Sequence, residues 1–397
     1  MAAINSFFDD PLQMRETTFL PNVNERPLRI LFVAGALSGG GAERQLLQLV
    51  TELHKLGQLV TVATIASNNV DTEFRQVELW NGKRRTKAGT FWGLAGALFR
   101  LRGLCAAERP DVVVGWLSIP IVLASITSWS NCIPFVASLR NSTPEQLSGR
   151  HRQKLQHTML RWSLRKANLV IANSQTGIER YTELGLIRKT PTRVIRNGID
   201  TRAFQSATAH CANAARAALG ISHQGPIALY VGRICHEKDI PLLVRVISAS
   251  LDCQQNLSWL VVGIALEKFL AIASAIDINI PTDRVLFIPR LHQMVLAYNA
   301  STILCLTSKS EGSPNCVLEA RACGIPVIST DCGDVRECMC PGDQIVATNP
   351  KAFTDAINEV LLPESQQLRH EAQVVSMNEC AKLWLSALRS VIPTKAD

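Results

Sequence analysis

The chain has 397 residues, of which 47% are hydrophobic and 19% are charged, and its formal net charge is +8. This composition excludes an intrinsically disordered protein, and the length is sufficient for two domains of ordinary size. The 12 cysteines show no paired C-x-x-C spacing, so we expect reduced thiols in a cytosolic protein and neither a disulfide framework nor a metal site.

The beginning of the chain is not expected to be a secretory signal, because Asp9, Asp10 and Pro11 interrupt its apolar run. The stretch 112–139 contains no charged residue and is the candidate for a membrane-spanning helix. Prolines and several hydroxyl side chains interrupt this stretch. We therefore favour a buried strand, a packed helix and a second buried strand.

Positive charge is concentrated in the first half of the chain. Residues 1–205 hold 26 Lys and Arg against 15 Asp and Glu, whereas residues 206–397 hold 15 against 18. A solvated basic face would explain this excess. The excess also favours contact with something anionic, either a membrane surface or a phosphorylated substrate.

Apolar runs of strand length alternate with helical patterns along nearly the whole chain, which predicts parallel α/β sheets. One helix is predicted from 43 to 56, where Leu46, Leu47, Val50 and Leu53 share a face. In the first half, the strands are predicted at 28–34, 58–64, 111–117, 134–139 and 168–174.

The same alternation starts again after a mixed, alanine-rich segment at 200–225, which is the best place for a domain boundary. The strands of the second half are predicted at 226–232, 258–263, 284–289, 302–307 and 326–330. The final segment, 364–391, is predicted to form one or two helices. We expect an α/β fold of two doubly wound, Rossmann-like domains facing each other across a cleft. Their bounds are 1–205 and 206–375, and the helix at 376–397 is expected to pack back on the first domain.

A glycine-rich turn follows the first predicted strand, at 34–44, and three consecutive glycines at 39–41 allow its backbone to approach a ligand closely. A dinucleotide fingerprint would also lie here. That fingerprint requires an acidic residue at the end of the second strand, and the segment 63–69 has none. The sequence therefore argues against a nicotinamide site.

The corresponding loop of the second half runs from Gly232 to Asp239 and places two cations at the exit of a strand. Arg233 can neutralise a diphosphate through paired donors, and Lys238 can do so as a point charge. Alone, the loop would be read as a surface turn. Its interpretation as a diphosphate-binding loop depends on the segment Glu311–Val327.

The segment Glu311–Val327 places two glutamates eight residues apart, one in a loop and one on a predicted helix. A Gly-Ser-Pro-Asn turn starts that helix, and Gly324 is expected to end it. The helix N-terminus suits a phosphate, because its free N–H groups and its dipole both favour negative charge.

Together these motifs resemble a known family. The glycine-rich turn, N-G-I-D at 197–200, G-R-x4-K at 232–238 and E-G-x-P-x4-E-A-x-A-x-G-x-P-V at 311–327 are similar to those of family 4 glycosyltransferases with the GT-B fold. The resemblance covers residues 28 to about 340. It implies retaining transfer of a sugar from a nucleotide donor, without a cofactor or a bound metal, and no D-x-D pair occurs in the sequence.

The resemblance also implies roles for single residues. Arg233 and Lys238 match the pair that binds the diphosphate. Glu319 would accept hydrogen bonds from the ribose hydroxyls, and Glu311 would face the donor sugar or stabilise positive charge at its anomeric carbon. The backbone N–H groups of Asn315, Cys316, Val317 and Leu318 would meet the phosphates, and Ser313 is a further donor-binding residue. Gly40 and Gly41 would close over the diphosphate, and Arg290 would pack on the nucleobase.

Three departures from the family pattern bear on sugar and acceptor. Residues 116–118 lack the histidine that many members carry at a strand end in the first domain. Arg140 and Asn141 resemble the Arg-Asn pair of N-acetylhexosaminyl transferases of polysaccharide assembly, which implies an acceptor-side role. Asp239 stands where glycine is usual, and Arg321 stands where methionine is common.

The predicted function is transfer of a hexose or N-acetylhexosamine from a nucleoside-diphosphate sugar, with UDP expected, to a lipid-linked or oligosaccharide acceptor in cell-surface polysaccharide synthesis. Two alternatives stay open: a GT-B nucleotide-sugar epimerase and a non-catalytic nucleotide-sugar-binding scaffold. We expect a cytoplasmic protein held peripherally at an anionic membrane surface, with no nucleic acid among its partners. The sequence leaves the oligomeric state open.

Overall fold

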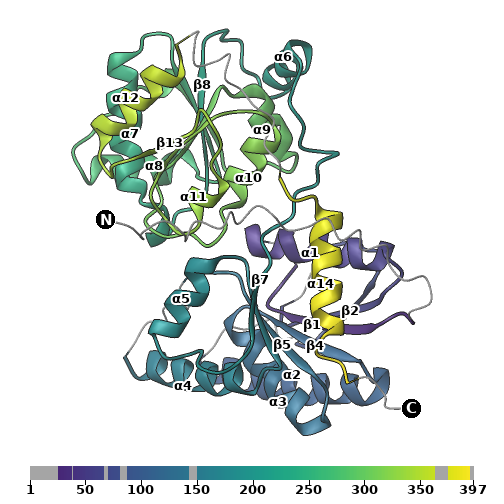
Figure 1. The fold of residues 1–397 in the computed structure, drawn as a ribbon. Coiled ribbons are helices and arrows are strands. Elements are labelled where there is room, and N and C mark those ends of the chain that lie inside the picture. The colour runs from purple at the N-terminus through teal and green to yellow at the C-terminus, as the bar shows by residue number, and fades with distance from the viewer. Residues whose placement is uncertain are drawn as a thin grey trace, which may run out of the picture.

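The protein folds into two α/β domains, drawn one above the other in Figure 1. The structure, a computed structural model, describes residues 26–37, 39–66, 70–80, 87–142, 150–362 and 374–393. Each domain has one sheet whose paired strands all run parallel. The predicted fold class, two doubly wound α/β domains with parallel sheets, is confirmed.

The first sheet has seven strands in the order β3-β2-β1-β4-β5-β6-β7. Its chain order reverses between β1 and β4, which is the kind of point where open α/β sheets bind ligands. The strands are β1 Arg29–Ala34, β2 Leu59–Thr64, β3 Arg75–Glu78, β4 Val112–Trp116, β5 Phe135–Leu139, β6 Leu169–Ala172 and β7 Thr192–Val194.

The second sheet has six strands in the order β10-β9-β8-β11-β12-β13 and reverses between β8 and β11. Its strands are β8 Ile227–Val231, β9 Ser258–Val262, β10 Val285–Ile288, β11 Ile303–Leu306, β12 Val327–Thr330 and β13 Gln344–Val346.

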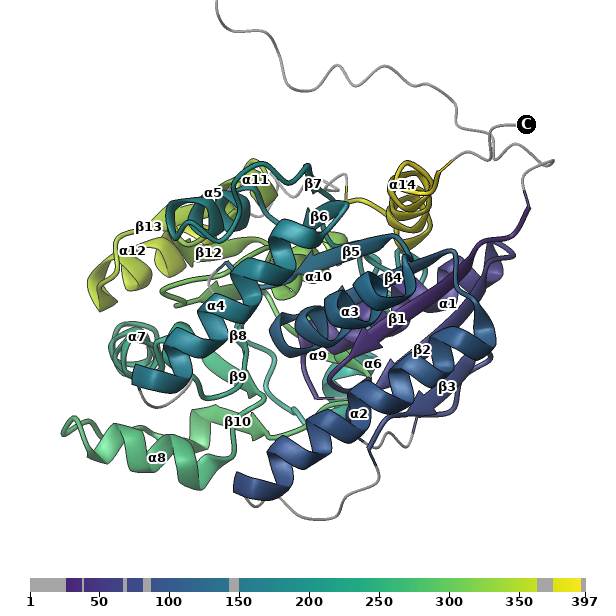
Figure 2. The ribbon, with the colours of Figure 1, turned by 90° about the horizontal axis from the view of Figure 1, so that it is seen from below.

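Helices cover both faces of each sheet (Figures 1 and 2). In the first domain they are α1 Gly41–Lys55, α2 Lys87–Glu108, α3 Ser118–Asn131, α4 Arg150–Lys166 and α5 Gln175–Glu183. In the second they are α6 Ala209–Ala218, α7 Ile240–Cys253, α8 Leu266–Ser274, α9 Met294–Ala300, α10 Asn315–Ala322, α11 Val335–Cys338 and α12 Pro350–Val360, with short 3₁₀ turns at His236–Lys238 and Thr282–Arg284.

The uncharged stretch 112–139 forms β4, α3 and β5, as predicted. Every residue of β4 is buried, which is why its sequence reads as a continuous apolar run. Gly115 is required here, because a Cβ atom at this position would lie 2.6 Å from the Cα of Ile121 on α3. Among the described residues, no helix is long and apolar enough to cross a membrane.

The last helix, α14 Met377–Arg389, returns to the first domain and lies beside α1 in both ribbon views. Trp384 is 1% exposed, and its ring centroid lies 5.7 Å from that of Trp116. This helix lies within the segment 364–391 that was predicted to be helical. Residues 364–373 of that segment are outside the part of the chain that the structure describes.

The two chain crossings between the domains pair with each other. Ile199 on the first crossing accepts from the amide of Met377 at 2.8 Å and donates to Val375 at 2.9 Å. A Cβ atom on Gly198 would lie 2.8 Å from the Cα of Met377, so the glycine of the N-G-I-D motif allows this close approach. The motif therefore lies at the domain junction, as its position in the sequence suggests.

Hydrogen bonds also join the two domains directly. The Asp334 carboxylate of the second domain accepts from the amides of Gln175, at 2.7 Å, and Thr176, at 3.0 Å, in the first turn of α5. The hydroxyl oxygens of Ser142 and Ser310 lie 2.7 Å apart. These contacts hold the loops at the carboxyl ends of the strands of the two sheets close together.

Candidate active site

The glycine-rich turn approaches the second domain at two points. A Cβ atom on Gly40 would lie 4.0 Å from Nη1 of Arg233, and one on Gly41 would lie 2.9 Å from Nδ2 of Asn315. Nδ2 of Asn315 donates to the Gly41 carbonyl at 3.2 Å. A side chain at Gly41 would therefore press on Asn315 at the start of α10, whereas one at Gly40 would meet Glu43 of its own turn, at 2.7 Å, and only touch Arg233.

Lys238 and Glu311 form an ion pair beside the start of α10. The Lys238 Nζ atom lies 2.7 Å from Glu311 Oε1, and the two side chains are 17% and 15% exposed. Ser308 donates to the same carboxylate oxygen at 2.7 Å. Burial by itself lowers the pKa of Lys238, but the Glu311 carboxylate outweighs it and leaves that pKa well above its usual value. The lysine is thus a fixed positive charge.

The start of α10 matches the prediction, with Pro314 as its N-cap and Asn315 as its first residue. The amides of Val317 and Leu318 donate to the Pro314 carbonyl at 3.1 and 3.3 Å. These two amides therefore already have a partner at the start of the helix, and their contact with phosphates remains a prediction. Among the proposed phosphate donors, the amides of Asn315 and Cys316 are the ones to which no backbone partner is assigned within the described residues.

Glu319 is only 2% exposed and is held by residues that the sequence reasoning missed. The Tyr298 hydroxyl donates to its Oε2 at 2.7 Å, and the Arg44 guanidinium, from the other domain, donates to its Oε1. Burial raises the pKa of Tyr298 well above its usual value, so its hydroxyl stays a donor. The signal that could have identified Arg44 is its position in the first turn after the glycines.

Arg140 follows β5 and is 7% exposed. Its guanidinium carbon lies 4.5 Å from the centroid of the Trp116 ring, and its Nη2 donates to Oδ1 of Asn197. Asn197 in turn donates to the Ser313 carbonyl at 3.0 Å and to the side chain of Asn315. Arg140 is thereby joined to the start of α10. The side chain of its neighbour Asn141 is half-buried.

Arg290 is exposed and follows β10, which is the edge strand of its sheet and lies two strands away from β8. Packing of Arg290 on a nucleobase remains a prediction.

The two departures in the second domain have structural explanations. Asp239 has φ +43°, in the left-handed region that favours glycine, and its side chain accepts from the amide of Leu242 at the start of α7. Arg321 forms a buried ion pair with Asp343 at 2.9 Å, and their side chains are 3% and 0% exposed. Neither replacement alters the phosphate side of the site.

The cysteines are all unpaired thiols within the structure, including Cys332, Cys338 and Cys340, which lie close together in the sequence. Burial raises the pKa of Cys332 and of Cys338 to about 11, so both stay protonated at neutral pH. Across the described part of the chain, no group of three or more His, Cys, Asp or Glu side chains is arranged to hold a metal ion.

The arrangement can bind a diphosphate between the two domains. Arg233, Lys238 and the N-terminus of α10 are its positive groups, and the backbone of Gly40 and Gly41 closes from the opposite side. Fixed cations and helix amides are suited to stabilising negative charge on a departing phosphate without reorganisation.

The sequence of each domain matches a known family model. Residues 39–203 match Glycosyltransferase Family 4 and residues 212–374 match Glycosyl transferases group 1. The two matches lie on the two domains described above and together cover most of the chain. The chain belongs to this family of glycosyltransferases.

Its curated relatives include enzymes of surface glycan synthesis. The chain is 31% identical over 175 residues to a lipopolysaccharide core biosynthesis mannosyltransferase of Rhizobium meliloti, a match that covers 42% of this chain and 49% of the relative. It is 23% identical over 370 residues to a D-inositol 3-phosphate glycosyltransferase of Corynebacterium urealyticum, covering 84% and 85%. The chain thus spans about half the length of the first of these relatives.

Solved structures show the same fold. HepE of Anabaena, crystallised with UDP and glucose, matches with a TM-score of 0.73 and 19% identity over 91% of this chain and 100% of that one. WaaG, a glycosyltransferase involved in lipopolysaccharide biosynthesis, matches with a TM-score of 0.70 and 16% identity over 92% and 100%.

Proposed function

We propose that the protein is a retaining glycosyltransferase that moves a hexose or N-acetylhexosamine from a nucleoside-diphosphate sugar, with UDP as the expected nucleotide. The observation that carries the proposal is the meeting of Arg233, the Lys238–Glu311 pair and the start of α10 with the glycine-rich turn of the other domain. The UDP-bound neighbour HepE supports this choice of donor class.

In this proposal the enzyme stabilises the leaving nucleoside diphosphate electrostatically. As the bond from the sugar to the diphosphate breaks, negative charge grows on the phosphate oxygens. Arg233 supplies paired donors and Lys238 a fixed point charge, while the first amides of α10 face the phosphates. Removing one such group typically costs about 100-fold or more in turnover.

The two glutamates take different roles in the proposal. Glu311 forms an ion pair with Lys238, and its carboxylate is the group we propose to stabilise positive charge that develops at the anomeric carbon. Glu319 accepts hydrogen bonds from Tyr298 and Arg44. We propose that it accepts hydrogen bonds from the ribose hydroxyls when Arg44 moves aside. Arg44 would then compete with the ribose for the same carboxylate.

We further propose that transfer requires no resident metal ion or other cofactor. The sequence has no D-x-D pair to hold a cation on the diphosphate. The charges that a metal would supply are present as Arg233, Lys238 and the helix dipole.

The proposed acceptor is lipid-linked or an oligosaccharide, in synthesis of a cell-surface polysaccharide or lipopolysaccharide. The rhizobial relative named for lipopolysaccharide core biosynthesis supports this class. We also propose that the protein works in the cytoplasm, docked on the inner face of an anionic membrane.

Helix α4 gives the membrane proposal its structural basis. Its 17 residues include six Lys or Arg and no Asp or Glu. Leu155, Met159 and Trp162 recur along one side of it, 61%, 39% and 37% exposed, and Trp162 meets the 65%-exposed Trp129 of α3 with ring centroids 6.2 Å apart. Exposed aromatic rings next to cations suit the interface of an anionic bilayer.

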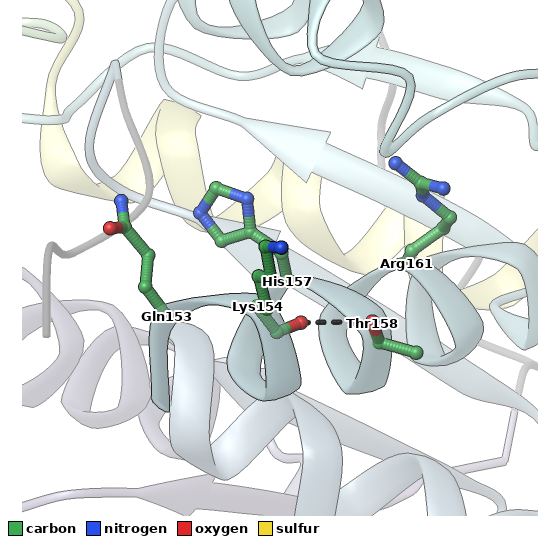
Figure 3. A pocket seen from close by; sticks show the side chains of 5 residues that line it. All are labelled: Gln153, Lys154, His157, Thr158 and Arg161. Atoms are coloured by element: carbon green, nitrogen blue, oxygen red, sulfur yellow. Dashed lines mark hydrogen bonds between the residues drawn. The ribbon is translucent and has the colours of Figure 1, made fainter. Parts of the chain in front are cut away.

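The same helix has a shallow hollow on an adjacent side (Figure 3). Lys154, His157 and Arg161 line it together with Gln153 and Thr158. Their side chains stand on one side of α4, and Arg161 extends towards the loop that contains Gly185. We propose that this hollow receives lipid phosphate groups, since it is lined by cations and lies far in the chain from the candidate active site.

The proposed function is tested by incubating the protein with a panel of nucleotide sugars and measuring release of the nucleoside diphosphate, with and without acceptors. Arg233→Ala, Lys238→Ala and Glu319→Ala should each abolish most of the release. Wild-type rates in all three would rule out the mechanism. Conversion of the donor sugar without an acceptor would indicate an epimerase, and UDP binding without turnover would indicate a non-catalytic binding protein.

A further inference from the structure

Arg140 is a buried cation whose hydrogen-bonding capacity is only partly used. It is 7% exposed, and among the described residues only Nη2 of its three guanidinium nitrogens has a hydrogen-bond partner, Oδ1 of Asn197. Nε and Nη1 are buried and have none among the described residues. A buried charge is normally paired and fully hydrogen-bonded, because burying an unpaired charge costs free energy of desolvation.

The neighbours of Arg140 do not compensate its charge. The structure shows no ion pair for it within the described residues, and the acidic group that acts on it there is the thiol of Cys380, whose pKa is raised to about 11 by burial, so that it is neutral at pH 7. Burial lowers the pKa of Arg140 to about 10, so the guanidinium still carries its proton at neutral pH. The Trp116 ring attracts the cation but offers no acceptor to its free N–H groups.

The position of this cation is fixed relative to the candidate active site. Asn197 accepts from Arg140 and donates to the Ser313 carbonyl and the Asn315 side chain, and Asn315 donates to the Gly41 carbonyl. Arg140 is thus one residue removed from the N-terminus of α10. The positive end of the helix and the guanidinium reinforce each other's attraction for an anion.

The environment of Arg140 differs from that of a structural arginine elsewhere in the chain. Arg216 is partly buried too, but its Nε donates to the Ala300 carbonyl at 3.0 Å and its Nη1 to the His223 carbonyl at 3.3 Å. A structural arginine uses its donors to join chain segments in this way. Arg140 instead has two nitrogens without a partner among the described residues, where the two domains meet.

We propose that Arg140 is a phosphate-binding residue of the first domain, whose free N–H groups take an anionic oxygen of the substrate between the domains, and that Asn197 positions it. The inference rests on the proposed function and extends it: the substrate places a phosphate against the first domain as well as against Arg233 and Lys238. That phosphate belongs to the donor diphosphate or to a phosphorylated acceptor, and the ionic chemistry is the same for both.

The proposal predicts an unusual combination of effects for Arg140→Gln. The variant should melt at the same temperature as the wild type or higher, because the substitution removes an uncompensated buried charge. Its affinity for inorganic pyrophosphate or UDP should fall about tenfold or more if the phosphate is that of the donor. Both quantities are measured on the full chain by differential scanning fluorimetry and isothermal titration calorimetry.

If the phosphate belongs to the acceptor, UDP affinity should stay unchanged in Arg140→Gln. The KM for a lipid-diphosphate-linked acceptor should then rise about tenfold or more, while the KM for an uncharged glycoside acceptor stays the same. Either pattern supports the proposal and identifies the source of the phosphate.

The matched control is Arg216→Gln, which should lower the melting temperature and leave pyrophosphate, UDP and acceptor binding unchanged. A marked loss of stability in Arg140→Gln, with wild-type affinities for UDP and for the phosphorylated acceptor, would overturn the proposal. If Arg140→Gln does not fold, Arg140→Lys replaces it. This variant keeps the positive charge but lacks the paired N–H donors of the guanidinium group. Wild-type affinities in it would also overturn the proposal.

Failure of this inference can be told apart from failure of the proposed function. If the wild type binds and turns over a nucleotide sugar and the Arg140 variants do so equally well, only the role of Arg140 is wrong. If the wild type binds no nucleoside diphosphate, the proposed function itself is wrong.

Discussion

The Glu311 carboxylate stabilises the charged form of Lys238 in the candidate site. The pKa of Lys238 is higher in the folded protein than in the unfolded chain, because the Glu311 carboxylate outweighs burial. The contribution of the pair to stability is therefore fully present below the unfolded pKa of about 10.4 and is lost only as the pH rises through the folded value.

This linkage predicts how stability depends on pH. The free energy of unfolding that separates the wild type from Lys238→Met should stay constant between about pH 7 and about pH 10, because the lysine remains charged in both states over that range. Urea denaturation of both proteins across this range measures the difference. A difference that disappears near neutral pH would show that the lysine loses its proton there, contrary to the structure.

Two buried tyrosine hydroxyls have opposite environments and form a matched pair. Tyr298 donates to the buried Glu319 at 2.7 Å, whereas the Tyr230 hydroxyl has no hydrogen-bond partner within the described residues. Tyr298→Phe should destabilise the protein by about 1–3 kcal/mol, since it removes one hydrogen bond of a buried carboxylate. Tyr230→Phe should leave the free energy of unfolding unchanged or raise it.

Urea denaturation of the two variants checks this contrast. Equal losses in the free energy of unfolding would mean that the Tyr298–Glu319 hydrogen bond does not stabilise the protein.

At the scale of elements, helix α14 is part of the first domain although it follows the second in the chain. Trp384 packs in the same core as Phe32 and Trp116. Leu383, the adjacent residue, is 47% exposed and gives a control at nearly the same place.

Trp384→Ala should destabilise the protein by about 3–5 kcal/mol, because it removes a large buried side chain and leaves a cavity. Leu383→Ala should change the free energy of unfolding by less than about 0.5 kcal/mol. Denaturation monitored by circular dichroism measures both. Similar effects of the two substitutions would contradict the packing of α14 on the first domain.

Sequence patterns predict the central strands well and the edge strands poorly. The ten predicted strands match β1, β2, β4, β5, β6, β8, β9, β10, β11 and β12, and no boundary is shifted by more than two residues. The strands β3, β7 and β13 have only three or four residues and none that is buried, so they lack the apolar run that the prediction requires.

The sequence likewise predicts some residues of the candidate site and misses others. Arg233, Lys238, Glu311 and Asn315 belong to short motifs, because their spacing is set by one loop or one helical turn. Arg44 contacts Glu319 across 275 residues of sequence, and only the docking of the two domains brings them together. Contacts of that kind have no local sequence pattern.

At the scale of the whole molecule, part of the positive charge of the first half of the chain lies on helix α4 of the first domain. The first domain carries α4, with its cations and its exposed apolar stripe, whereas the second contributes Arg233, Lys238 and Glu311 to the candidate site.

Docking through α4 predicts a clear difference between lipids. The protein should sediment with vesicles of phosphatidylglycerol and stay in solution with vesicles of phosphatidylcholine, and added salt should weaken the binding. The double variant Trp129→Ser and Trp162→Ser should bind less well, while Leu266→Ser, which changes a 37%-exposed residue of the second domain, should bind as the wild type does. Equal binding by all three proteins would exclude α4 as the docking surface.

The central claim is that a nucleoside diphosphate binds between the two domains, on the cations and helix N-terminus of the second. Calorimetric titration of UDP into the wild type, Arg233→Ala, Lys238→Ala and Lys309→Ala tests it most directly. Lys309 is 47% exposed and pairs with Asp239 next to Lys238, so its variant controls for charge alone. The account predicts that affinity falls about tenfold or more in the first two variants and stays unchanged in the third. Equal UDP affinity in all four proteins would contradict it.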